Sequence, residues 1–380
     1  MAERLRWGLI GGGEGSQIGE PHRIAARLDG LYDFVAGALD VDAERGRAFA
    51  RALGVPSDRA YGDWREMLEA ERARPDPVEV VTVATPNVTH YEIARAFLEA
   101  GMHVVCEKPM TMTEAEAESL VAVAEPADRR LVVNFGYSGY PMVREARARI
   151  ARGDAGHVRL VVAEFAHGHH ADAAEAENPR LRWRYDPAQT GVSSALADAG
   201  IHALHMVGFV TGQRIAALSA QFDSLVPGRK LEDNATVSLR YAGGTLARLW
   251  ASAIAIGQMH GLNIRVFGEK AGLAWHQERP NQLLWTPVGG ATTIVERGSP
   301  ELSPEAAEAG RFAMGHPEGL PVAFANLYRD LHTAIRETDG ARRDAAAARL
   351  PLGPQGAEMV AAVHAAAGSA AAGGTWMEMG

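Results

Sequence analysis

The first third of the chain alternates short continuous apolar runs with amphipathic stretches of helical period. The apolar runs lie at 6–12, 33–40, 78–84, 103–106 and 131–136. Amphipathic stretches, several ended by glycine or opened by an aspartate, follow them at 20–30, 43–54, 63–73, 90–101 and 113–125. Continuous rather than alternating apolar strands are typical of a parallel sheet covered on both faces. With right-handed crossovers this pattern predicts a doubly wound α/β domain, and we place its end at residue 138.

Beyond residue 139 the pattern changes to longer strands that follow one another. A helix is predicted at 141–153, strands at 157–166, 214–223, 234–254 and 262–277, and a helix at 194–212. Two closing helices are predicted at 322–338 and 356–371. Consecutive long strands around one internal helix indicate an α+β domain with a large, mostly antiparallel open sheet over 139–380.

Composition narrows the class of protein. The 380 residues carry a net charge of −9 without a basic block, which gives a nucleic-acid partner little support. No apolar run approaches the roughly 18 residues that a membrane span requires. The first residues enter a strand pattern at once, which leaves no room for a secretion signal, and Cys106 is the single cysteine. We therefore expect a cytoplasmic protein without disulfides or a cysteine-ligated zinc.

The first loop, LIGGGEGSQIGEPHR, has the context of a dinucleotide-binding turn. It lies between a strand and a helix, and the next strand closes on Asp40. Gly11 and Gly13 suit the tight turn and the close approach of a pyrophosphate, and Gly19 suits the third glycine role in a loop stretched by three residues. The alternative is a glycine-rich loop without a ligand. Asp40 would accept the ribose hydroxyls and repel a 2′-phosphate, which favours NAD.

Two later strand ends also carry candidate chemistry. ATPNVTH, residues 84–90, follows a buried strand, and the alternative there is a strand ended by proline with Asn87 capping a helix. CEKP, residues 106–109, contains one of only three lysines, against 35 arginines. Lys108 therefore suggests a need for a compact, tunable ammonium, although a solvated lysine at a strand end is the simpler interpretation.

The predicted helix at 194–212 contains Asp198 and His202, four residues apart and hence expected on one face. Oxidation of an alcohol needs a group that removes the hydroxyl proton, and histidine suits that task near neutral pH. Asp198 could orient the histidine or bind a substrate hydroxyl. An exposed ion pair is the alternative, and His205 is interpreted as structural.

Together these motifs resemble the glucose–fructose oxidoreductase/inositol dehydrogenase/MocA family over essentially the whole chain. EKP with the downstream D-x-x-x-H is the most specific element. The stretched loop, YPMVREA, WRYDP and FGEKAGLAW…GHPEG are similar to a branch that includes inositol and L-glucose dehydrogenases. The resemblance implies NAD as cofactor, no metal, a sugar or cyclitol substrate, and a homodimer or homotetramer formed through the C-terminal sheet.

The resemblance also implies roles for individual residues. The catalytic group would be Lys108, Asp198 and His202. The cofactor would contact Gly11, Gly13, Ser16, Ile18, Gly19, Asp40, Thr85, Pro86, Asn87, His90, Glu107 and Lys108. The substrate would contact Lys108, Tyr137, Arg184, Asp198, His202 and His316, although Arg184 and His316 could equally be turn residues beside proline.

Two features depart from the branch. GIH stands where G-T-H is more usual, and His167, His169 and His170 enrich a strand end in histidine. A metal site there is the weaker interpretation, because spacing alone defines no ligand geometry, and an altered substrate preference is the stronger one. A glycosidase that uses NAD for transient oxidation, and a non-catalytic NAD(H)-binding sensor, stay open as alternatives to a dehydrogenase.

Overall fold

The computed structural model describes residues 3–178 and 182–380, which form two compact units. One unit consists of Met1–Gly136 with Leu320–Ala357, and the other of Tyr137–Gly319 with Glu358–Gly380. Residues 320–357 lie beyond the predicted boundary at 138/139 but belong to the first unit, because the long helix that they contain packs on the first helix of the chain. We refer to the nucleotide unit and the sheet unit.

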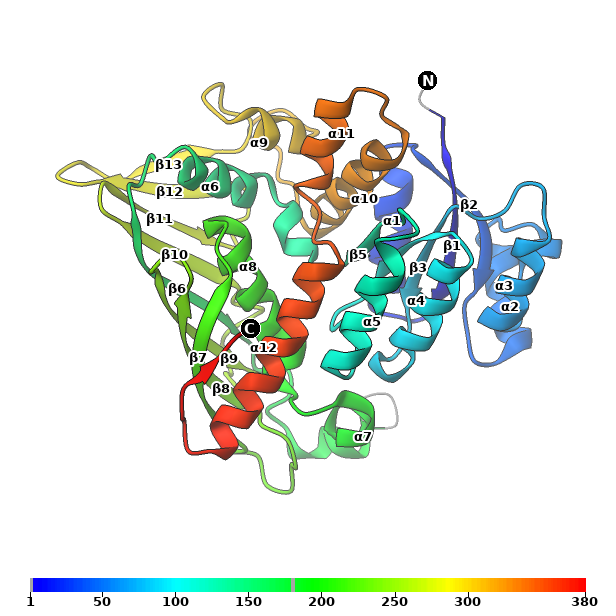
Figure 1. Ribbon diagram of the computed structural model, residues 1–380, viewed down its shortest axis with the longest axis horizontal. Helices are drawn as coiled ribbons and strands as arrows, with labels where there is room; N and C mark the ends of the chain where they lie inside the picture. Colours follow the sequence, from blue (N-terminus) through cyan, green and yellow to red (C-terminus); the bar gives the residue numbers. More distant parts are fainter. Residues whose placement is uncertain (1–2, 179–181) are drawn as a thin grey trace. The chain divides into compact units, whose positions relative to one another are not determined.

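The nucleotide unit contains a five-stranded parallel sheet (Figure 1). Its strand order is β2-β1-β3-β4-β5, so β1 and β3 are neighbours although β2 separates them in the chain. The strands are β1 (Leu5–Gly11), β2 (Tyr32–Ala38), β3 (Val80–Ala84), β4 (His103–Cys106) and β5 (Leu131–Val133). Since the strand order reverses between β1 and β3, a ligand is expected at the carboxyl ends of these two strands.

The helices of the nucleotide unit begin where the sequence provides caps. Asp42, Asp63 and Thr113 each accept a hydrogen bond from the first turn of a helix, and Thr113 with Glu116 completes a capping box. Asp42 and Asp63 are therefore the N-caps of their helices. The helices are α1 (Gly19–Leu28), α2 (Ala43–Ala52), α3 (Trp64–Arg72), α4 (His90–Glu99), α5 (Glu114–Ala124), α10 (Leu320–Arg336) and α11 (Gly340–Ala347).

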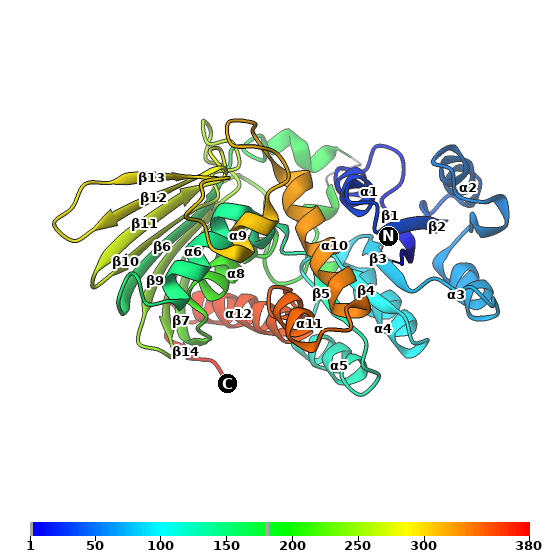
Figure 2. The ribbon, with the colours of Figure 1, turned by 90° about the horizontal axis from the view of Figure 1, so that it is seen from above.

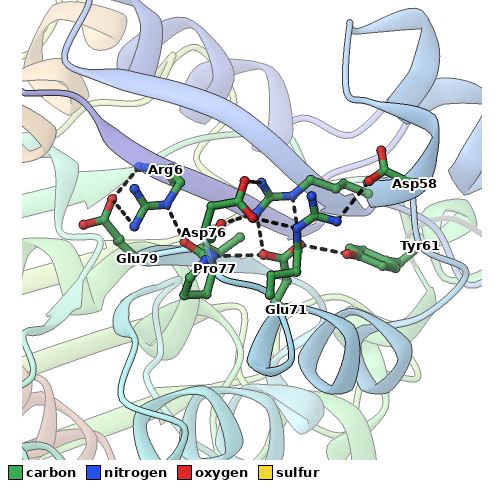
Figure 3. A network of polar contacts seen from close by, with 10 residues as sticks. Arg6, Asp58, Tyr61, Glu71, Asp76, Pro77 and Glu79 are labelled. Carbon is green, nitrogen blue, oxygen red and sulfur yellow. Dashed lines mark hydrogen bonds and ion pairs between the residues drawn. The ribbon is translucent and has the colours of Figure 1, made fainter.

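A network of ion pairs lies at the amino-terminal edge of this sheet (Figure 3). Arg59 and Glu71 are both buried, and their closest nitrogen and oxygen atoms are 2.5 Å apart. The hydroxyl of Tyr61 also donates to Glu71. Close by, Glu79 pairs with Arg6 at the start of β1. This edge is opposite to the one where β1 ends in Gly11, so these charges stabilise the fold away from the predicted ligand edge.

The sheet unit contains nine strands in the order β13-β12-β11-β10-β6-β9-β8-β7-β14. All neighbouring strands are antiparallel except β6 and β9, which confirms a mostly antiparallel sheet. The strands are β6 (Val158–Ala166), β7 (Ile215–Asp223), β8 (Asn234–Tyr241), β9 (Leu246–Ser252), β10 (Asn263–Gly268), β11 (Ala271–His276), β12 (Gln282–Pro287), β13 (Thr293–Glu296) and β14 (Met377–Glu378).

Helices pack against one face of the nine-stranded sheet (Figure 2). The helices in contact with its strands are α6 (Pro141–Ala151) and α8 (Ile201–Thr211), and α9 (Pro304–Ala309) packs on α6. The sheet unit also contains α7 (Pro187–Thr190) and α12 (Gly353–Ala371), of which α12 begins in the nucleotide unit. Strands such as β8 alternate buried and exposed residues, as a sheet with one covered face should. Among the described residues no helix is both long and apolar enough to span a bilayer.

The predicted helix at 194–212 differs from expectation at its start. Leu196–Gly200 forms a π-helical turn, and the α-helix begins only at Ile201. Asp198 therefore lies on the wider π turn and His202 on the following α-helix. The assumption of regular i, i+4 spacing was wrong, because a sequence pattern does not reveal a π turn, a feature frequent at functional sites.

Candidate active site

Glycines shape the loop between β1 and α1, residues 11–19, here called the glycine loop. Gly11 and Gly12 have φ of +72° and +64°, values that favour glycine. A Cβ atom at Gly11 would lie 2.5 Å from the carbonyl oxygen of Ala84, and one at Gly13 would lie 2.5 Å from that of Leu39. The backbone of this loop is therefore closely surrounded, and Gly12, which the sequence analysis did not single out, shares in the turn.

The start of α1 packs directly on this turn. A Cβ atom at Gly19 would lie 2.1 Å from the carbonyl oxygen of Gly12. The hydroxyl of Ser16 accepts a hydrogen bond from the Gly19 amide at 3.1 Å, and Ile18 occupies the N-cap position without a side-chain cap. A tight turn, closely packed backbone and an open helix N-terminus are the features that fit a dinucleotide pyrophosphate.

Asp40 lies just after β2, and its carboxylate is paired. The guanidinium of Arg45 donates to its two oxygens at 2.8 and 2.6 Å, and the amide of Asp42 donates at 3.0 Å. The hydrogen bond from Arg45 is the main reason that the pKa of Asp40 lies below its ordinary value. The carboxylate is thus ionised and held in place, as a ribose-binding acceptor requires, but a cation that the sequence analysis did not consider accompanies it.

The TPN segment continues from β3 as a short 3-10 turn, Asn87–Thr89, before α4. No side-chain cap from Asn87 is present at the start of α4, so the capping interpretation of Asn87 is wrong. His90 is fully buried, and its ring contacts the carbonyl oxygens of Thr85 and Pro109, each at 2.8 Å. His90 therefore ties the loop after β3 to the loop after β4, and its contact with a cofactor stays a prediction.

The EKP segment follows β4 at the same edge. Lys108 is partly exposed there, and the Lys108–Pro109 peptide bond is cis. Glu107 is buried, and its carboxylate accepts hydrogen bonds from His22 at 2.9 Å and from the Asn134 amide. The Glu107 side chain, which is predicted to contact the cofactor, thus forms its hydrogen bonds with other residues of the nucleotide unit. The carboxyl ends of β1, β3 and β4 bring the glycine loop, TPN and EKP to one sheet edge.

In the sheet unit, the π turn that carries Asp198 is anchored by a buried carboxylate. Oε1 of Glu232 accepts from the amides of Ser194 and Leu196 at 2.9 and 3.0 Å and from the Ser193 hydroxyl at 2.6 Å. Burial raises the pKa of Glu232 despite these donors. Glu232 therefore satisfies the first amides of the turn, a role that no local pattern indicated because it comes 34 residues after Asp198.

Asp198 and His202 have different surroundings. An oxygen of Asp198 accepts a hydrogen bond from Arg184 at 2.5 Å, which brings two of the predicted substrate contacts together. His202 is buried, and the ring of Tyr137 meets its ring edge to face with centroids 4.7 Å apart. Phe165 packs near both rings. The sheet unit thus gathers four of the predicted residues around one aromatic wall.

Further histidines extend this wall. The rings of His167, His169 and His260 lie within 5.0 to 6.1 Å of one another, and Phe165 also contacts His167 and His260. Burial, followed by the charge of His170, lowers the pKa of His167 to about 4. In the described part of the chain no three His, Cys, Asp or Glu side chains are grouped to hold a metal. His260 was missed because it lies 93 residues after His167.

His316 lies in an exposed turn of the sheet unit. Its backbone carbonyl accepts a hydrogen bond from Arg297, and its ring faces solvent. His316 is thus a turn residue, as one of the two interpretations predicted, and its contact with a substrate stays a prediction.

Comparison with known proteins identifies both parts of the chain. Residues 5–135 match the model of an oxidoreductase family with an NAD-binding Rossmann fold, and residues 143–274 match the GFO/IDH/MocA C-terminal domain. An inositol dehydrogenase homolog from Azotobacter vinelandii, crystallised with NAD+, is 43% identical, with a TM-score of 0.95 over 100% of this chain and 98% of that one. The crystal structure of a homolog from the same organism with NADH and myo-inositol has 42% identity and a TM-score of 0.93 over the same shares.

Curated relatives agree with this assignment. The uncharacterized oxidoreductase YfiI of Bacillus subtilis is 40% identical over 339 residues, which cover 88% of this chain and 86% of the relative. The levoglucosan dehydrogenase of Pseudarthrobacter phenanthrenivorans is 27% identical over 74% of this chain and 76% of its own length. With matching models for both domains and full-length relatives above 40% identity, the chain belongs to the Gfo/Idh/MocA family of NAD-dependent oxidoreductases.

Proposed function

We propose that the protein oxidises a secondary alcohol of a cyclitol or sugar to a ketone, and reduces the ketone in reverse. The observation that carries this proposal is the charge balance around Asp198 in the sheet unit. The carboxylate is matched by Arg184, and the nearby His167 has a pKa of about 4 and is therefore neutral at pH 7. A paired carboxylate and an imidazole that is neutral at pH 7 offer hydrogen bonds without an excess charge, which suits an uncharged, hydroxyl-rich substrate.

Two relatives support the same substrate class. The Azotobacter vinelandii homolog was crystallised with myo-inositol, and the Pseudarthrobacter enzyme is named for levoglucosan. Both compounds are uncharged polyols. Myo-inositol is the first compound to test, because the relative crystallised with it is the more similar of the two.

We assign the chemistry to three residues. His202 accepts the hydroxyl proton, because an imidazole can take up a proton near neutral pH. Lys108 donates a hydrogen bond to the same oxygen and stabilises the negative charge that develops there. Asp198, in concert with Arg184, orients the substrate hydroxyls. NAD, when bound, supplies the hydride acceptor.

The cofactor contacts divide into backbone and side-chain groups. The glycine loop offers backbone amides at the N-terminus of α1 for the pyrophosphate. Asp40 offers an ionised, immobilised carboxylate for the ribose hydroxyls. Thr85, Pro86 and Asn87 lie at the end of β3, next to the glycine loop, where they can cover the cofactor. We retain Lys108 in this set and assign His90 and Glu107 to support.

Activity is tested by following NADH absorbance when purified protein and NAD are mixed with inositols, aldoses and glycosides. NADH formation with an inositol or a free sugar is the expected result. Glycoside cleavage without net NADH would instead indicate the glycosidase mechanism. NAD binding without turnover of any compound would favour the non-catalytic NAD(H)-binding sensor and would contradict the proposal.

The acid–base assignment is tested with His202→Ala. Turnover should fall by roughly 10²–10⁴, the usual contribution of general acid–base catalysis, with NAD affinity retained. His205→Gln, which changes another buried histidine of α8, should keep most of the turnover. Near-native turnover in His202→Ala would return D-x-x-x-H to a structural role.

We also propose a cytoplasmic homodimer or homotetramer formed through the sheet. Strand register places exposed Leu246 and Phe267 on either side of Leu160, on one face of the sheet. The same face includes exposed Ile294. Light scattering after gel filtration should give two or four chains, and Leu246→Glu should reduce that number. A native monomer would contradict this assembly.

A further inference from the structure

The carboxylate of Asp40 already holds most of the hydrogen bonds that it can accept. Oδ1 accepts from Nη2 of Arg45 at 2.6 Å and from the amide of Asp42 at 3.0 Å. Oδ2 accepts from Nε of Arg45 at 2.8 Å. Among the described residues these are the donors that reach this carboxylate. Since a carboxylate accepts about four hydrogen bonds, one position is left, and it belongs to Oδ2.

The remaining position lies beside the glycine loop. A Cβ atom added at Gly13 would lie 3.4 Å from Oδ2 of Asp40, so this oxygen borders the segment that is assigned to the pyrophosphate. The two adjacent hydroxyls of a ribose offer two donors, and Asp40 can accept only one of them while Arg45 keeps its place. The ribose of NAD and the guanidinium of Arg45 therefore compete for the same carboxylate.

Arg45 can exchange this partner for another anion. It lies in the first turn of α2, and its side chain is 57% exposed, against 15% for that of Asp40. An ion pair with an exposed partner contributes little to stability, so its loss costs little. A guanidinium also binds a phosphate through two parallel hydrogen bonds, as it binds the carboxylate here. NADP differs from NAD by a phosphate on the 2′ oxygen of the ribose that Asp40 would bind, within the surroundings of Arg45.

Acidic neighbours limit how favourable a 2′-phosphate can be. The charges of Asp42 and of Glu14, in the glycine loop, act on Arg45 in addition to that of Asp40. The carboxylate of Asp42 also accepts from the backbone amide of Arg45 at 3.0 Å, so it stays close to this arginine. Three negative charges thus surround one positive charge, and NAD stays the preferred cofactor.

We propose that Arg45 is a specificity-determining residue that reduces the preference for NAD and lets the protein bind NADP as a second cofactor. It occupies acceptor positions of Asp40 that the ribose hydroxyls of NAD need, and it offers its guanidinium to the 2′-phosphate of NADP. The inference rests on the assignment of Asp40 to the ribose in the proposed function. It does not depend on which alcohol the protein oxidises.

The test measures the Kd of NAD and of NADP by quenching of protein fluorescence, so it needs neither substrate nor turnover. The native protein should bind both, and NAD more tightly. In Arg45→Ala the Kd of NADP should rise at least about tenfold, the lower end of the effect of losing a hydrogen bond to a charged group. The Kd of NAD should stay equal or fall, because the ribose gains the acceptor positions that Arg45 occupied. Arg45→Lys, which keeps the charge but not the two parallel donors, should give a Kd of NADP between those of the native protein and Arg45→Ala.

Arg47→Ala provides the matched control. Arg47 lies on the same helix and pairs with Glu66 at 2.7 Å, so this variant removes an equal charge without touching Asp40. Its ratio of NAD to NADP affinity should equal that of the native protein, and thermal melting verifies that each variant is folded. An unchanged ratio in Arg45→Ala, or no NADP binding by the native protein at about 1 mM, would overturn the inference. If no alcohol is oxidised but the ratio changes in Arg45→Ala, the proposed function fails while the role of Arg45 stands.

Discussion

Replacing Gly19 with alanine tests whether the packing of α1 on the glycine loop forms the cofactor site. The added Cβ atom would lie 2.1 Å from the carbonyl oxygen, 2.5 Å from the Cα and 2.6 Å from the carbonyl carbon of Gly12. Ordinary contacts are about 3.5 Å, so one segment has to move by more than about 1 Å. All three obstructing atoms are backbone, so no side-chain rotation relieves the overlap.

The expected magnitude follows from the cost of overpacking. Inserting a methyl group where none fits costs about 1–3 kcal/mol. If the glycine loop moves away from its cofactor-binding shape, that cost appears in NAD affinity, and Kd should rise between about 5- and 150-fold. The β1 strand is buried and paired on both sides, so the loop is the segment that yields.

The assay is NAD binding by quenching of protein fluorescence, with thermal melting to verify folding. Gly15→Ala is the matched control, because Gly15 lies in the same loop but a Cβ atom there meets nothing within 4 Å. Its positive φ makes alanine strained with and without cofactor, so Kd should change by less than about threefold. Native affinity in a folded Gly19→Ala protein would refute the third-glycine role.

Three further changes test other parts of the structure. Asp40→Ala should lower the affinity for NAD and reduce the ratio of NAD to NADP affinity, because Arg45 then remains without its carboxylate partner. Asp42→Ala, which removes only a helix cap, should keep the native ratio. An unchanged ratio in Asp40→Ala would contradict the assignment of Asp40 to the ribose. Glu232→Ala should reduce kcat at least about tenfold with NAD affinity intact, because the amides that begin the π turn lose their acceptor. Glu232→Gln keeps an acceptor oxygen and should retain most of the native kcat. Equal losses of kcat in the two variants would contradict an anchoring role. The pKa of His103 is lowered to about 4, first by burial and then by two arginines, so between pH 6.5 and 4 the unfolded chain binds a proton that the folded chain does not, and stability falls as the pH falls. His103→Asn should flatten the decline of Tm over that range, and an equally steep decline would contradict the assignment.

The local pattern of apolar and polar residues was sufficient to predict much of the secondary structure of the nucleotide unit. Continuous apolar strands and intervening amphipathic helices predicted the parallel sheet, because each signal depends only on neighbouring residues. Caps such as Asp42 and Thr113 are equally local. The resemblance to the family was visible in EKP and D-x-x-x-H in their order, which a single sequence contains in full. The predicted catalytic roles of Lys108, Asp198 and His202 still await their kinetic tests.

Tertiary structure decided what depends on residues far apart in the chain. The pairing of Glu107 with His22, the anchoring of the π turn by Glu232, and the approach of His260 to His167 each join segments separated by tens of residues. Residues 320–357 belong to the nucleotide unit because α10 packs on α1, and the Tyr328 hydroxyl lies 2.8 Å from both Thr82 Oγ1 and His22 Nδ1, contacts that no local periodicity reveals. The sequence alone could therefore locate reactive groups at strand ends, whereas only folding could show which buried charges and hydrogen bonds hold them.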